Sequence, residues 1–200
     1  GAALALVSRE YRDRAARIIH SVKSVDNKIA NLLLFTRKPE PLFRDQRIHD
    51  VLQDILRFSV EILEKEGIRL TVRLAGGNPL VRADGELLKQ VFLNIILNAV
   101  QAMRGGGELT IETRLHNDPA LRPGMERTLE LRFADTGSGI AEEDRRRIFD
   151  PFFSTRERGS GLGLAIVHNI MDLHRGTVGV EMGEKGGSVF TVLLPLVTAE

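Results

Sequence analysis

Cysteine is absent from the 200-residue chain, which excludes a disulfide framework as the source of its stability. Long hydrophobic runs are absent too, since no apolar stretch approaches the ~18 residues that a membrane-spanning helix needs. The apolar start, residues 1–7, is too short for a signal peptide and has no basic flank, so we interpret it as the end of a helix. The 5 histidines are too scattered along the sequence to predict a zinc cluster.

An excess of charge of either sign is also lacking. The formal net charge is +1, which gives no reason to expect nucleic acid as a partner. With 42% hydrophobic and 28% charged residues, the composition is that of a soluble globular protein that can bury one good core and carry a substantial appendage. We therefore expect a cytoplasmic location without direct membrane insertion, although a longer parent protein could be bound to a membrane.

The first part of the chain predicts a long helix with one apolar seam. Either this seam is half of a dimeric bundle, or the helix packs against the chain's own domain. Prolines at positions 39 and 41 remove backbone donors and favour an extended linker. We divide the chain into a helical dimerisation segment at residues 1–38, a linker at residues 39–47 and a globular domain at residues 48–200. The seam shows the alternating spacings of four and three of a heptad, at Tyr11, Ala15, Ile18, Val22, Val25, Ile29 and Leu32.

Beyond the linker, helical and strand patterns follow one another. Asp84 can cap the second long helix, and the glycines at positions 105–107 stop it. These patterns predict an α/β (α+β) two-layer sandwich, in which about three helices cover one face of a mixed sheet. We expect helices at residues 48–66, 84–103, 142–148 and 162–174, and strands at residues 68–74, 109–115, 128–134, 178–182 and 188–194.

Two glycine-rich segments have the features of a nucleotide pocket. Asp135 follows a predicted strand, where a carboxylate can accept the exocyclic amine of adenine, and the glycines after it let the backbone approach the ring. Residues 159–164 (GSGLGL) open a predicted helix, whose first N–H groups form a site for anionic oxygens. An isolated Asp-Thr-Gly is also common turn chemistry, so the function rests on the combination of segments.

Two asparagines lie on one face of the predicted helix at residues 84–103. Asn94 and Asn98 are four residues apart, and two carboxamides on an apolar helix need partners, because an unpaired buried amide costs ~1–3 kcal/mol. For Asn98, a structural hydrogen bond is the alternative to a ligand. Magnesium takes oxygen ligands and usually keeps several waters, so one or two such side chains are enough to hold it.

Four segments together resemble, in order and spacing, the N, G1, F and G2 boxes of the catalytic and ATP-binding domain of bacterial sensor histidine kinases. That family belongs to the superfamily of gyrase, Hsp90-type chaperones, histidine kinases and MutL. The resemblance covers residues 40–195 and implies ATP as ligand, ADP as product, Mg²⁺ as metal and a response regulator receiver domain as partner. The segments are residues 90–103 (QVFLNIILNAVQAM), 135–140 (DTGSGI), 149–153 (FDPFF) and 159–164 (GSGLGL).

The resemblance also implies a role for each residue of the site. Asn98 would coordinate Mg²⁺ with help from Asn94, and we take these two as the catalytic residues. Asp135 would bind adenine. The family often has a basic residue where Gln101 stands, and Gln101 and Arg104 could touch phosphate. We expect nucleotide contacts from Asn94, Asn98, Gln101, Asp135, Gly137, Gly139, Ile140, Arg156, Gly159, Ser160, Gly161, Leu162, Gly163, Leu164 and Ser188.

A polar segment at residues 154–160 is interpreted as a lid over the phosphates. Arg156 and Arg158 could reach the γ-phosphate, although such charges are usually solvated, and the family commonly has lysine at position 156. The phenylalanines of residues 149–153 are expected to brace the lid and a neighbouring bundle rather than to stack on the base. Ser188 follows Gly187 and resembles the family's closing Gly-Thr element, in which a hydroxyl helps to hold the adenine-binding aspartate.

The family's phosphoacceptor histidine, which a carboxylate and then Asn-Pro follow, is not found in this sequence. Either the sequence begins after it or the protein has lost it. His20 falls at an outward heptad position, so we interpret it as a solvated surface histidine.

Three functions remain open: the nucleotide-binding part of a histidine kinase, an ATPase of the gyrase or chaperone kind, and a module that binds nucleotide without chemistry. Position 94 discriminates between the first two, because hydrolysis in gyrase-like relatives needs a glutamate base there and Asn94 cannot take a proton. The presence of every box argues against the third. We therefore predict a histidine kinase part that is not self-sufficient.

Overall fold

The computed structural model describes residues 40–117, 127–156, 159–184 and 186–197. These residues belong to one compact unit that runs from Glu40 to Glu200. The helical segment predicted for residues 1–38, with its seam and His20, lies outside the described residues, as does Arg158. Among the described residues, no helix combines the length and the apolar character that crossing a bilayer would require.

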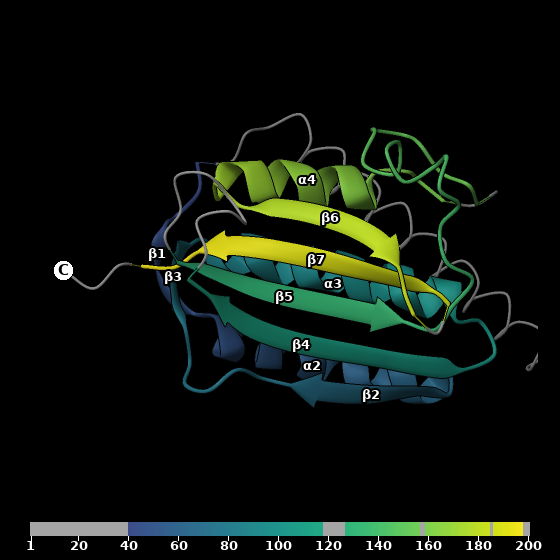
Figure 1. The fold of residues 1–200 in the computed structure, drawn as a ribbon, viewed down its shortest axis with the longest axis horizontal. Coiled ribbons are helices and arrows are strands. Elements are labelled where there is room, and N and C mark those ends of the chain that lie inside the picture. Colours follow the sequence, from purple (N-terminus) through teal and green to yellow (C-terminus); the bar gives the residue numbers. More distant parts are fainter. Residues whose placement is uncertain (1–39, 118–126, 157–158, 185, 198–200) are drawn as a thin grey trace, which may run out of the picture. The chain divides into compact units, whose positions relative to one another are not determined.

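A mixed sheet of five strands forms one layer of the domain (Figure 1). Its first two strands, β2 and β4, run parallel, and the other neighbouring pairs are antiparallel. In order across the sheet, the strands are β2 (Ile68–Arg73), β4 (Gly107–His116), β5 (Thr128–Asp135), β7 (Ser188–Pro195) and β6 (Thr177–Met182).

Three helices form the second layer: α2 (Ile48–Lys65), α3 (Gly85–Ala102) and α4 (Gly163–Leu173). In the view of Figure 1, α2 and α3 lie behind the sheet, and α3 packs against both α2 and α4. The predicted α/β sandwich, with a mixed sheet and three helices, is confirmed.

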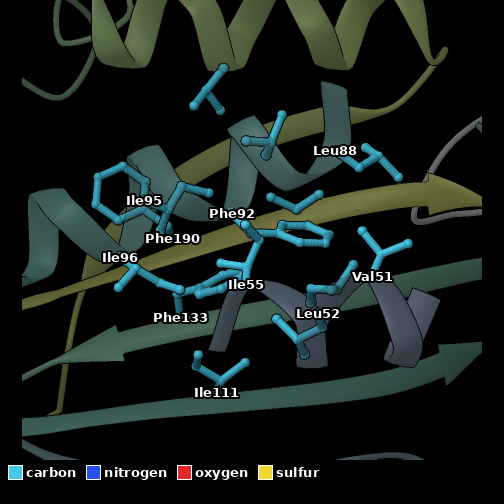
Figure 2. Close-up of a cluster of buried hydrophobic side chains, with 14 of the residues drawn as sticks. Val51, Leu52, Ile55, Leu88, Phe92, Ile95, Ile96, Ile111, Phe133 and Phe190 are labelled. Carbon is cyan, nitrogen blue, oxygen red and sulfur yellow. The ribbon is translucent and has the colours of Figure 1, made fainter. Parts of the chain in front are cut away.

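The core lies between the sheet and the helices. On β5, Leu131 and Phe133 are fully buried, and Phe133 meets Phe92 of α3 with ring centroids 5.8 Å apart (Figure 2). Successive side chains of a strand point to opposite faces. Arg132 accordingly lies on the other face of the sheet, where its Nη2 is 3.0 Å from Oε1 of Glu181 on β6. The apolar positions of the strands thus fix which face the helices cover.

α3 begins and ends where the sequence predicts. The side chain of Asp84 accepts the N–H of Glu86 at 3.0 Å and the N–H of Leu87 at 3.2 Å, so Asp84 is the N-cap. The helix ends at Ala102, and Gly105 follows with a φ of 99°, a conformation that favours glycine.

Two short strands are not predicted by the sequence pattern. β1 (Arg44–Arg47) and β3 (Leu80–Ala83) pair antiparallel in a sheet of their own. Residues 44–47, which we predicted as part of the linker, lie in this sheet. The segment RDQR has no apolar alternation, so its strand conformation depends on a partner that is distant in sequence. A hydrogen bond from the N–H of Ile48 to the carbonyl of Pro79, 3.0 Å long, holds the two segments together.

The helix predicted at residues 142–148 is not formed. These residues make a series of turns, in which Asp144 and Arg147 each donate to the carbonyl three residues earlier, at 3.0 and 2.8 Å. Such spacing is typical of tight turns, and so short a segment gains little from the cooperativity that stabilises an α-helix.

Candidate nucleotide site

α3 and the start of α4 meet at Asn94. Its Oδ1 lies 3.2 Å from the position that a Cβ on Gly163 would occupy, so glycine allows the close approach. Leu162 takes the N-cap position of α4, and its side chain has no acceptor. The first N–H groups of α4 therefore keep their capacity to donate, at the positive end of the helix dipole and beside the Asn94 carboxamide.

Asp135 is buried at the end of β5, with 4% of its surface exposed. Its Oδ1 accepts the N–H of Gly137 at 2.8 Å, and a second backbone hydrogen bond comes from Ser188. Burial raises the pKa of the Asp135 carboxyl, and these two backbone donors and the charge of Arg156 act in the opposite direction. A carboxylate can accept about four hydrogen bonds, so Asp135 retains capacity for an N–H of a ligand.

Gly187 fixes the position of Asp135 and was not among the predicted site residues. Its φ is 71°, and a Cβ at this position would collide with the carbonyl oxygen of Asp135 and lie 2.8 Å from Oδ1. The interaction that the structure shows from Ser188 to Asp135 comes from its backbone N–H. The predicted role of the Ser188 hydroxyl in holding Asp135 stays a prediction.

The loop after Asp135 packs on the last turn of α3. A Cβ on Gly137 would lie 2.6 Å from the carbonyl oxygen of Ala102, and that oxygen accepts the N–H of Ser138 at 3.2 Å. A Cβ on Gly139, which has a φ of 71°, would lie 3.1 Å from the carbonyl oxygen of Gly187. These contacts join the adenine side of the predicted site to the helix that carries both asparagines.

Arg156 lies over the C-terminal turns of α3. Its Nη1 donates to Oε1 of Gln101, and its Nη2 lies 3.5 Å from the carbonyl oxygen of Asn98. Partial burial lowers the pKa of Arg156, the nearby charge of Arg104 lowers it further, and the charge of Asp135 opposes both. The guanidinium group of Arg156 thus lies beside Asn98, and Arg104 is near enough for its charge to act on Arg156. The resemblance implies a basic residue at position 101. The structure has Gln101 there, and its Oε1 accepts a hydrogen bond from the guanidinium group of Arg156.

The phenylalanine segment contacts the glycine-rich loop through its backbone. The N–H of Phe152 donates to the carbonyl of Gly161 at 3.0 Å. Both residues have a positive φ, 66° for Phe152 and 65° for Gly161, and a Cβ on Gly161 would collide with the Phe152 carbonyl group. Arg147 lies 4.5 Å from the ring centroid of Phe153. The loop at residues 159–164 is therefore braced from the side of residues 149–153.

The remaining predicted contacts surround these loops. Ile140 and Leu164 pack against the core, and Leu162 is 5% exposed, so these side chains anchor the loops. Ser160 accepts the N–H of Leu162 at 3.4 Å, and Gly159 lies against the hydroxyl group of Ser154.

The donor set near Asn98 suits magnesium. In the described part of the chain, no group of three or more histidine, cysteine, aspartate or glutamate side chains could hold a metal. Asn94 and Asn98 are half-buried on α3, where both can offer amide oxygens. Because Mg²⁺ keeps several waters and binds phosphate oxygens, one or two such ligands from the protein are sufficient.

Comparisons with known proteins agree with this geometry. Residues 83–198 match the family described as histidine kinase-, DNA gyrase B-, and HSP90-like ATPase. The sensor histidine kinase ZraS of Klebsiella oxytoca is 32% identical over 193 residues, which cover 96% of this chain and 38% of ZraS.

Two solved structures are similar. The catalytic domain of histidine kinase ThkA has a TM-score of 0.66 and 27% identity, over 77% of this chain and 97% of that domain. Full-length ShkA in complex with AMPPNP has a TM-score of 0.72 and 29% identity, over 90% of this chain and 37% of ShkA. The chain spans 23% to 44% of the length of the curated relatives.

Proposed function

Because this chain belongs to the histidine kinase-, DNA gyrase B- and HSP90-like ATPase family, we propose that it is the ATP-binding catalytic part of a sensor histidine kinase. In this function, the γ-phosphoryl group of Mg-ATP passes to a histidine and then to an aspartate of a response regulator receiver domain. The observation that carries the proposal is that α3 contacts both predicted segments: Asn94 lies against the start of α4, and the loop after Asp135 packs on Ala102.

The adenine of ATP fits the end of the site where Asp135 lies. A buried carboxylate that two backbone N–H groups already hold accepts the exocyclic amine of adenine, whereas the carbonyl oxygen of guanine would face it with a second acceptor. Gly137, Gly139 and Gly187 let the loops around Asp135 pack backbone against backbone, which holds the carboxylate in place. These features support ATP rather than GTP as the nucleotide.

We place the phosphates between the first N–H groups of α4 and the guanidinium group of Arg156, which lies beside Asn98. When bound, Mg²⁺ would supply positive charge that neutralises part of the charge of the phosphates. Asn98 would hold the ion through its amide oxygen, and Asn94 would assist as ligand or phosphate donor. Phosphoryl transfer depends mainly on such positioning and charge stabilisation.

The nucleophile is proposed to be a histidine rather than water. Asn94 occupies the position next to the start of α4 where an ATPase would need a general base, and a carboxamide cannot take a proton. The homology to proteins named as sensor histidine kinases supports the same choice. We also propose that the segment at residues 1–38 mediates homodimerisation and that this part of the protein works in the cytoplasm.

Phosphotransfer in trans tests the proposal. The chain is mixed with a separate helical hairpin that carries a His-Glu/Asp-x-x-Asn-Pro string, and γ-³²P-ATP is added. We expect acid-labile label on the hairpin histidine, which Asn98→Ala abolishes. Gln53→Ala, on the exposed face of α2, serves as the matched control and retains the labelling. ATP binding without label on any histidine would favour a non-catalytic nucleotide module instead.

A further inference from the structure

His174 is a buried residue at the end of α4 that no part of the proposed chemistry uses. Its surface is 3% exposed. Its Nε2 lies 3.0 Å from the backbone nitrogen of Asp84, and its Nδ1 lies 2.8 Å from the carbonyl oxygen of Ile170. The ring of Phe43 meets the imidazole edge-on, with centroids 5.1 Å apart. His174 therefore joins three segments: α4, the start of α3, and the residues that precede β1.

The partners fix the protonation state of this imidazole. A carbonyl oxygen can only accept, so Nδ1 carries the hydrogen, and a backbone N–H can only donate, so Nε2 accepts. If Nε2 were also protonated, its N–H would face the backbone N–H of Asp84, and this hydrogen bond would be lost. The N-cap of α3 places one charged group near the ring, the Asp84 carboxylate. The contacts from α4 and from residues 40–43 are uncharged: the Ile170 carbonyl and the Phe43 ring. Burial lowers the pKa of His174, and the Ile170 hydrogen bond and the Asp84 charge oppose this.

Asp84 extends the connection in two directions. Its Oδ1 caps α3 by accepting from Glu86 and Leu87, and its Oδ2 accepts the N–H of Leu42 at 2.9 Å. We call His174, Asp84, Leu42 and Phe43 the latch. Through the latch, the chain that enters the domain is bonded to the first turn of α3, and that turn is bonded to the last turn of α4.

The latch lies at the opposite end of both helices from the nucleotide loops. α3 starts at the latch and carries Asn94 about 15 Å further along, at 1.5 Å per residue. α4 ends at the latch and begins, about 16 Å away, with the glycine-rich loop. Because Asn94 already lies against Gly163, a small shift of α4 along α3 changes the space that the phosphates would occupy.

We propose that His174 is a positioning residue of the nucleotide site. In its neutral form, His174 holds α3 and α4 in the register that binds nucleotide, and its protonation loosens that register. Nucleotide affinity then falls in acid through a group that never touches the nucleotide. The inference rests on the nucleotide site of the proposed function but not on phosphoryl transfer, so ADP binding tests it even where phosphotransfer fails.

The test compares ADP affinity at pH 7.5 and pH 5.5, by calorimetry on the whole chain, for the wild type, His174→Gln and His49→Gln. Glutamine offers a donor and an acceptor but does not titrate. His49 is the matched control, because it too is buried with a lowered pKa but bonds to Thr113 between α2 and β4. Titration of the nucleotide and of Asp135 is common to all three proteins.

Between the two pH values we expect the wild type and His49→Gln to lose several-fold more affinity than His174→Gln, because protonation of His174 adds to the acid loss only where the imidazole is present. Coupling is reciprocal, so saturating ADP should lower the pKa of His174 in NMR titrations of the wild type and leave that of His49 unchanged. The NMR test needs no variant and decides the question even where His174→Gln fails to fold. Equal acid losses in all three proteins, or a His174 pKa that ADP does not move, would overturn the proposal.

Discussion

At the scale of single residues, the site depends on how the backbone holds one buried carboxylate. Asp135 could be predicted because a carboxylate after a strand and before glycines is a local pattern. The close contact of Gly187 with Asp135 could not, because it exists only after β7 pairs with β5, which brings together residues far apart in sequence. Ser188 was predicted through its hydroxyl, whereas the structure shows its backbone N–H on Asp135.

Asp135→Asn should abolish detectable binding of ATP and ADP without loss of the fold. The amide would present a donor to the amine of adenine, and a mismatched buried pair costs ~1–3 kcal/mol or more. Since burial raises the pKa of Asp135, the ionised group costs folding free energy at neutral pH, and the neutral asparagine should melt at the same or a higher temperature. Calorimetry and thermal melting check both points, with the exposed Asp172→Asn as control. Wild-type affinity in Asp135→Asn would remove Asp135 from the adenine site.

Gly187→Ala should destabilise the domain more than Gly186→Ala. Both glycines have a positive φ, at a cost of about 1–2 kcal/mol for alanine. Only at Gly187 would the new Cβ collide with Asp135, because nothing lies within 4 Å of a Cβ on Gly186. Urea unfolding measures the difference, and nucleotide binding should be lost in Gly187→Ala alone. Equal free energies of unfolding in the two variants would show that the contact with Asp135 does not contribute to stability.

At the scale of elements, the long and well-capped segments could be predicted from the sequence, whereas the short ones could not. α3 was predicted to within a residue at each end, because Asp84 caps it and an apolar stripe repeats along it. β1 and β3 were missed, because four-residue strands carry no periodicity and each takes its conformation from the other. The composition of residues 142–148 predicts a helix, but so short a segment gains too little from helix cooperativity and forms turns instead.

Asn98→Ala should remove the dependence of ATP affinity on magnesium. The amide oxygen of Asn98 is the proposed protein ligand, and the described residues offer no carboxylate cluster to replace it. ATP titrations with and without Mg²⁺ measure the effect. Gln101→Ala is the matched control one turn further along α3, since it removes the acceptor of Arg156 and should weaken ATP binding while magnesium dependence persists. A magnesium dependence that survives Asn98→Ala would place the metal elsewhere.

At the scale of the whole molecule, the two-layer arrangement follows from alternation in the strands and from three amphipathic helices, and both are visible in the sequence. The layers also bury two histidines in regions that sequence alone does not connect. His49 bonds to Thr113 of β4, and His174 bonds to the start of α3. Neither was predicted, because an isolated histidine on a helix gives no sign of a distant partner.

Stability should therefore fall in mild acid. Burial lowers the pKa of His49 and His174 below the ordinary value of 6.5, so below that pH the unfolded chain binds protons that the folded chain does not. The free energy of unfolding should be highest above pH 7 and should decrease as the pH falls through 6.5. Urea unfolding between pH 7.5 and 5.5 measures this slope, and the double variant His49→Gln with His174→Gln should flatten it. An unchanged slope would show that both histidines titrate alike in the folded and unfolded chain.

The proposed function requires that this pocket positions a phosphoryl group without activating water. The most direct test is ATP hydrolysis by the chain alone, measured as the release of inorganic phosphate. Since Asn94 cannot act as a base, we expect tight nucleotide occupancy with very slow turnover, far below the rate of labelling of an added hairpin histidine. Asn94→Ala should leave that slow rate unchanged. Rapid hydrolysis by the wild-type chain that Asn94→Ala abolishes would contradict the kinase function and favour an ATPase.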